Sequence, residues 1–205
     1  MATHKDTVAA LLDRAGRTYA EQAGIKLADK PAPLYRLLVL ATLLSTRISA
    51  DIAVAAASEL SEFGTPRKMV DATWQQRVDA LGRGHYVRYD ESTATALGEG
   101  AQLLLDSYGG DVRRMRGDDL AKHLRKMPRL GPVGVDIFCR EAQLVWPELR
   151  PHLDDKTLDG ADRVGLPADA KKLAGLVRDA DLARFSAALV RVSLDKELAE
   201  QVRAA

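Results

Sequence analysis

The stretch Met127-Pro-Arg-Leu-Gly-Pro-Val-Gly-Val135 separates a polar helical pattern over 118–126 from an apolar one over 135–145. Its two glycines allow the chain to turn sharply, so we expect two helices joined by a tight bend. The second helix would start with free backbone N–H groups. The positive end of its dipole would then suit a phosphate.

This arrangement is typical of a helix-hairpin-helix motif, predicted over 117–146, which contacts a nucleic-acid backbone without reading bases. Gly131 and Gly134 could instead only end one helix and begin the next. A basic helix end is also what compensation of a helix dipole would produce. The predicted DNA-binding residues of this region are Lys126, Arg129, Leu130, Gly131, Val133 and Gly134.

Composition limits the type of DNA contact. The chain has 205 residues, of which 46% are hydrophobic, enough for one domain or two small lobes with a sizeable core. Its net charge is only +1, from 30 Lys+Arg against 29 Asp+Glu. Any DNA contact must therefore be local.

Several classes of protein are disfavoured. The single cysteine, Cys139, lies in an apolar run and excludes an internal disulfide or a four-cysteine iron–sulfur site within one chain. The histidines show no ligand spacing, so we expect no metal and no cofactor. No apolar stretch approaches the roughly 20 residues of a membrane helix, and the N-terminus lacks a signal-peptide core. We expect a soluble, cytoplasmic, nucleoid-associated monomer.

Helical periodicity runs through nearly every segment, and the sequence predicts an all-α fold. We expect two helical lobes with a cleft between them: residues 1–32 with 147–205, and residues 33–146. A first amphipathic helix is predicted over 7–23 and a buried central one over 34–44. Asp154 or Asp155 would cap a helix that ends near 164.

From 33 to 167, the order of these pieces resembles the helix-hairpin-helix DNA glycosylases of the endonuclease III type. Leu43-Leu44-Ser45-Thr46-Arg47 is similar to that family's Leu-Leu-Ser-x-Gln segment, and 82–89 to its Gly-Leu-Tyr-like turn. The bend at 127–135 aligns with its Leu-Pro-Gly-Val-Gly-Arg-Lys hairpin. Leu153-Asp154 falls at its Val-Asp, and 163–166 follows at the matching spacing.

Departures from the family pattern concern the chemistry. Arg129 replaces the first hairpin glycine, Pro132 the arginine, and Val133 the lysine that bifunctional members use as nucleophile. An alignment placing 130–134 on the motif puts Asp136 at the lysine position instead. Neither alignment supplies the amine that a Schiff-base lyase step requires. Lys156 is only a remote substitute, and the family's iron–sulfur loop is missing.

The resemblance implies that Asp154 is catalytic. Hydrolysis of an N-glycosidic bond without an amine needs a negative charge beside the developing oxocarbenium ion and an oriented water, and one aspartate can serve both needs. The alternative is that Asp154 only caps a helix. If Asp154 is catalytic, Asp155 becomes the expected cap.

The resemblance also suggests where a flipped nucleotide would be contacted. Arg47 occupies the position that fills the gap left by that nucleotide, although it could be a solvated loop residue. Tyr86, Tyr89 and His85 could line a base pocket by stacking. The tyrosines could equally belong to a partly buried core.

Together these features predict a monofunctional DNA glycosylase acting on double-stranded DNA that carries a damaged or mismatched base. One alternative is a catalytically inactive DNA-binding module, motivated by Arg129 and Pro132. Another is a hairpin that contacts a protein. Uracil, mispaired thymine or adenine, oxidised pyrimidines and alkylated purines all stay open as target bases.

Overall fold

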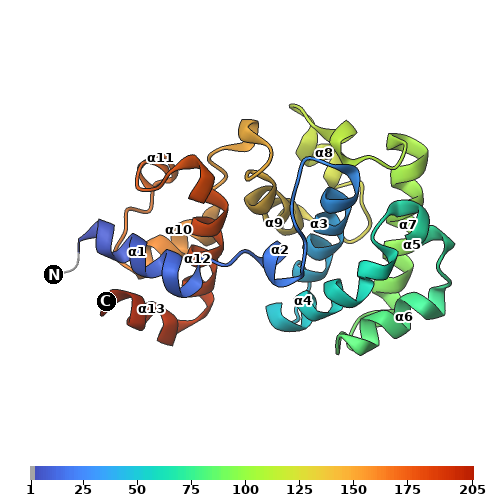
Figure 1. Ribbon diagram of the computed structural model, residues 1–205, viewed down its shortest axis with the longest axis horizontal. Coiled ribbons are helices and arrows are strands. Elements are labelled where there is room, and N and C mark those ends of the chain that lie inside the picture. Colours follow the sequence, from blue (N-terminus) through green and yellow to red (C-terminus); the bar gives the residue numbers. More distant parts are fainter. Residues whose placement is uncertain (1–2) are drawn as a thin grey trace. The chain divides into compact units, whose positions relative to one another are not determined.

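The computed structural model describes residues 3–205, and all regular structure in that range is helical, as predicted (Figure 1). The chain divides into a terminal unit, made of the residues up to Tyr19 and Cys139–Ala205, and a central unit, Ala20–Phe138. Two helices begin in one unit and end in the other: α2 (Tyr19–Gln22) and α9 (Pro132–Ala142).

The remaining elements belong to one unit each. The terminal unit holds α1 (His4–Ala15), η3 (Pro147–Leu149), α10 (Asp155–Arg163), α11 (Ala170–Ala174), η4 (Asp179–Asp181), α12 (Leu182–Leu194) and α13 (Lys196–Arg203). The central unit holds α3 (Pro31–Leu44), α4 (Ala50–Glu59), η1 (Leu60–Phe63), α5 (Pro66–Asp71), α6 (Trp74–Arg83), α7 (Asp90–Tyr108), η2 (Val112–Met115) and α8 (Leu120–Leu124).

Helix α12 carries the core of the terminal unit. Its side chains Phe185, Leu189 and Val192 are fully buried against α1 and α10, which lie beside it in Figure 1. Burial of each such side chain contributes roughly 1.5–3 kcal/mol. Gly160 lets α10 approach closely, because a Cβ there would lie 2.0 Å from the Leu189 carbonyl oxygen.

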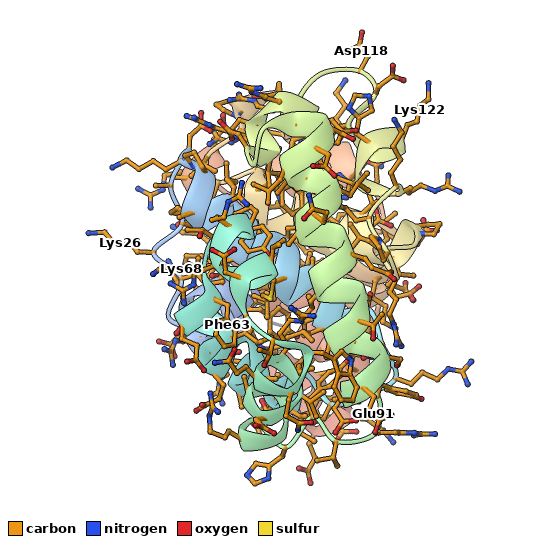
Figure 2. All side chains as sticks on the ribbon, turned by 90° about the vertical axis from the view of Figure 1, so that its right-hand side faces the viewer. Lys26, Phe63, Lys68, Glu91, Asp118 and Lys122 are labelled. Carbon is orange, nitrogen blue, oxygen red and sulfur yellow. The ribbon has the colours of Figure 1, made fainter. Side chains whose placement is uncertain are left out.

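Helix α3 is the buried centre of the central unit, as its nearly uniform apolar sequence predicted. Leu34, Leu37, Leu40 and Leu43 have no exposed surface. Figure 2 shows α7 crossing the front of this unit, with the charged side chains of Glu91, Asp118 and Lys122 pointing away from the helices. This outer surface carries both signs of charge.

A buried arginine ties α5, α6 and α7 together. Arg77 donates from Nη1 to the carbonyl oxygens of Met69 (2.9 Å) and Ala72 (2.7 Å) and from Nε to that of Ala94 (2.9 Å). Burial lowers the pKa of Arg77 from its ordinary value. The guanidinium lies over Gly98, where a Cβ would be only 2.8 Å from Nη2.

The first helix differs from prediction. Instead of one helix over 7–23, α1 ends at Ala15 and α2 starts at Tyr19. Gly16 is the C-cap of α1, and its N–H donates to the Leu12 carbonyl at 3.2 Å. The Gly16 carbonyl instead accepts from Arg184 Nε at 3.1 Å.

The chain passes from one unit to the other at 19/20 and 138/139, whereas the lobes expected from the sequence have boundaries at 32/33 and 146/147. Ile25 N–H bonds to the Ala20 carbonyl (2.8 Å) and Arg36 to that of Ala23 (3.3 Å), which ties 20–25 to the central unit. Gln143 bonds to His152, which ties the residues after α9 to the terminal unit. Within the described range, no helix combines the length and apolarity that crossing a membrane requires.

Candidate functional site

The segment predicted to form the hairpin, 127–135, joins α8 to the start of α9. Leu124, Met127 and Leu130 are buried beneath it, and the Leu130 N–H donates to the Met127 carbonyl at 3.1 Å. Among the described residues, the N–H groups of Gly131, Val133 and Gly134 have no hydrogen-bond acceptor. The start of α9 therefore presents unpaired donors, as the first turn of any helix does unless it is capped.

The two hairpin glycines have different environments. Gly134 is buried, and a Cβ there would lie 2.6 Å from Leu130 Cδ1, so a larger residue would displace the Leu130 side chain. Gly131 is exposed, has no atom within 4 Å of a Cβ built on it, and does not have a positive φ. Neither packing nor backbone conformation requires glycine at Gly131.

Arg129 adopts a backbone conformation that favours glycine, with φ of 63°. Its guanidinium hydrogen-bonds Ser92 Oγ and lies 5.7 Å from the centre of the Tyr89 ring. Arg88 lies 5.2 Å from the same ring. Arg129 thus links the hairpin to the start of α7 while its side chain stays exposed.

Leu130, predicted as a DNA-binding residue, is buried in the structure. Its side chain is only 2% exposed, and its N–H is already bonded to Met127. Leu130 therefore packs beneath the hairpin and has no free donor for a phosphate. Lys126, Val133 and the end of the Arg129 side chain are exposed, as a binding surface requires.

Tyr86, predicted as a possible base-pocket residue, is buried in the structure. Its ring is fully buried, and its hydroxyl shares a 2.7 Å hydrogen bond with Thr46 Oγ1, so it cannot stack on a base in this structure. It anchors the turn that follows α6. The neighbouring His85 (φ 62°) is exposed, and Tyr89 is half-buried.

The central unit brings three of the predicted segments together. Thr46 contacts Tyr86, Ser45 Oγ donates to the Arg129 carbonyl at 3.5 Å, and Arg129 reaches Tyr89. Arg47, in the first of these segments, is exposed directly after α3. Residues 45–47, 86–89 and 129–134 therefore form one neighbourhood.

Asp154, in the terminal unit, is the N-cap of α10. Its Oδ1 accepts from the Thr157 N–H at 3.3 Å, and its Oδ2 lies 3.3 Å from Arg140 Nη2. Asp155, the expected cap if Asp154 were catalytic, is instead the first helical residue. Lys156 lies 3.9 Å from Asp159 on the surface of α10.

Two buried residues near the end of α9 support Asp154 and were missed in the sequence. Arg140 pairs with the carboxylate itself. Gln143 accepts from the His152 N–H (3.0 Å) and donates to the His152 carbonyl (3.1 Å) and to Ser186 Oγ (3.1 Å). An arginine within an apolar helical run was the available clue, because a buried charge needs a partner.

The observed architecture is the all-helical fold of endonuclease III. One similar solved structure is a trapped endonuclease III–DNA covalent intermediate, in an estranged-adenine complex. The match covers 93% of this chain and 85% of the endonuclease III chain, with a TM-score of 0.51 and 15% identity. A non-covalent endonuclease III–DNA complex matches the same shares, with a TM-score of 0.52 and 14% identity. No family model and no curated protein matches the sequence.

Proposed function

We propose that this protein is a DNA glycosylase that hydrolyses the N-glycosidic bond of a damaged or mismatched base without a lysine-dependent lyase step. The observation that carries the proposal is the exposed start of α9. There, neither packing nor backbone conformation in the folded chain explains why residue 131 is glycine. The fold is shared with proteins solved as DNA complexes, which supports DNA as the ligand.

The hairpin is proposed to bind a strand phosphate. Amide donors at a helix start bind anions, and glycine allows the phosphate to approach the backbone. The exposed cations Arg129, Lys126 and Arg47 would add charge contacts from the same unit. Such contacts fix the position of the DNA and do not read its sequence.

Asp154 is proposed to provide the chemistry. Its carboxylate would stabilise the developing oxocarbenium ion and orient or deprotonate the attacking water. Oδ1 already accepts from the Thr157 N–H and Oδ2 is paired with the Arg140 guanidinium, which fixes the orientation of the group. A carboxylate offers about four acceptor positions, so capacity for a water is left.

The remaining residues support a monofunctional reaction. Val133 cannot form a Schiff base, and Lys156 is near Asp159 on the surface of α10. The iron–sulfur cluster of many family members does not fit this chain. Cys139 is its only cysteine and is buried in α9, whereas such a cluster takes four thiolates.

A second candidate function is DNA binding without catalysis. The observation that favours it is the engagement of Asp154, whose side chain is 12% exposed, caps α10 and pairs with Arg140. A carboxylate with these contacts can also serve only to cap the helix.

A base-release assay distinguishes base excision from DNA binding without catalysis. Duplexes carrying uracil, a mispaired thymine or adenine, an oxidised pyrimidine or an alkylated purine are incubated with the protein, and abasic sites are revealed with alkali. We expect strand breaks only after alkali, and their loss in Asp154→Asn with duplex binding retained. Cleavage without alkali would contradict the monofunctional reaction. Binding without abasic sites on any duplex would establish the second function.

Gly131→Asp tests whether the hairpin binds DNA at all. A carboxylate beside the proposed phosphate should weaken binding of a duplex with a stable abasic-site analogue, because like charges repel. Unchanged binding would instead indicate that the hairpin contacts a protein.

A further inference from the structure

A buried ion pair holds the carboxylate of Asp154. Arg140 Nη2 lies 3.3 Å from Asp154 Oδ2, and the two side chains are 9% and 12% exposed. Arg140 extends from the last turns of α9, whereas Asp154 starts α10. The pair therefore connects two helices of the terminal unit.

This pair is poorly explained by stability alone. Removing two charges from water costs free energy that their attraction often fails to recover, and apolar replacements of similar volume are often neutral or stabilising. Arg140 Nε is also buried with no acceptor among residues 3–205. An unpaired buried donor adds to that cost.

What the pair does provide is a carboxylate with one orientation. The guanidinium of Arg140 lies beside the carboxylate. Its contact with Oδ2 and that of the Thr157 N–H with Oδ1 restrict rotation of the group. Gln143 fixes the preceding backbone at His152.

We infer that Arg140 is a positioning residue, which keeps the Asp154 carboxylate oriented for base excision. The inference rests on the proposed function. It assigns to α9 a second role, since the same helix presents the hairpin amides at its start and Arg140 near its end. Arg140 acts through Asp154 and has no direct part in the reaction.

The test separates chemistry from binding. Single-turnover excision is measured for wild type, Arg140→Gln and Arg140→Lys on the duplex of the above panel that wild type processes fastest. The rate constant at saturating protein reports chemistry, and the half-saturating protein concentration reports binding. The matched control is Arg191→Lys. Arg191 is another arginine of the terminal unit with a buried, unpaired nitrogen, but it bonds to the Ala15 and Arg17 carbonyls.

We expect Arg140→Gln to lower the saturating rate about 100-fold, as misorientation of a catalytic group can, with half-saturation unchanged within about two-fold. Arg140→Lys should recover most of the rate, because it restores a cation with less suitable geometry. Arg191→Lys should lower the Tm and leave the rate unchanged. If Arg140→Gln does not fold, Arg140→Lys must still be slower than Arg191→Lys.

Equal saturating rates for wild type and Arg140→Gln, or for the two lysine variants when Arg140→Gln does not fold, would overturn this inference and leave the proposed function intact. A loss confined to half-saturation would also overturn it, because Arg140 would then serve binding. Absence of base release by wild type on every duplex would overturn the proposed function and the inference with it.

Discussion

Gly131 combines an open environment with an ordinary backbone conformation, so its replacement can be separated from effects on folding. We predict that Gly131→Ala leaves the Tm nearly unchanged but weakens binding of an abasic-analogue duplex about ten-fold, through a lost phosphate contact worth roughly 1.4 kcal/mol. Fluorescence anisotropy and circular dichroism measure the two effects. Gly82→Ala is the control, since Gly82 has equally open surroundings within α6. Equal affinities for the two variants would contradict the phosphate site.

Arg129 presents the opposite case, a large side chain with φ of 63°. Arg129→Gly should relieve backbone strain of about 1 kcal/mol and raise or maintain the Tm. The same change should weaken duplex binding and reduce the slope of log affinity on log salt by about 1, because one phosphate contact is lost. A lower Tm with unchanged binding would show that the contacts with Tyr89 and Ser92 serve stability only.

The hydrogen bonds of the buried Arg77 make α7 sensitive to substitution at Gly98, although replacing glycine by alanine normally stabilises a helix. Gly98→Ala should lower the free energy of unfolding by about 1–3 kcal/mol, because the added methyl displaces a guanidinium held by three carbonyls. Urea denaturation measures the change. A gain in stability, as expected for Gly82→Ala, would mean that Arg77 can move at little cost.

The start of η2 should respond to pH. Hydrogen bonds from the Arg113 side chain lower the pKa of Asp111 below its ordinary value of 3.8. The contribution of Asp111 to stability is therefore full above the unfolded pKa and is lost as pH falls through the folded one. Asp111→Asn should lower the Tm at pH 7 and show a shrinking difference from wild type below about pH 4. A difference that persists in acid would contradict the ion pair as its cause.

For the whole molecule, a net charge of +1 means that DNA binding depends on a few local cations. If Arg47, Lys126 and Arg129 each neutralise one phosphate, the slope of log affinity on log salt should be about −3. Changing all three to glutamine should bring the slope near zero, whereas Lys171→Gln with Lys172→Gln in α11 should leave it unchanged. If the two sets of substitutions changed the salt slope equally, DNA would be attracted by surface cations in general and not by these three residues.

The sequence by itself determined the helical class and the approximate positions of most helices, because periodicity, prolines, glycines and capping residues act on near neighbours. The buried central helix was predicted over 34–44, and in the structure it begins three residues earlier, at Pro31. The prediction of a single helix over 7–23 was wrong, because α1 ends at the C-cap Gly16, whose carbonyl accepts from Arg184, a residue distant in the sequence.

Only the tertiary structure decided the environment of the candidate site residues. It buried Tyr86 and Leu130, made Asp154 the cap, and supplied Arg140 as its partner. It also distinguished Gly134, which packs closely on Leu130, from Gly131, which has open surroundings. Burial and charge pairing depend on residues distant in the chain, and local sequence patterns do not encode which of them meet.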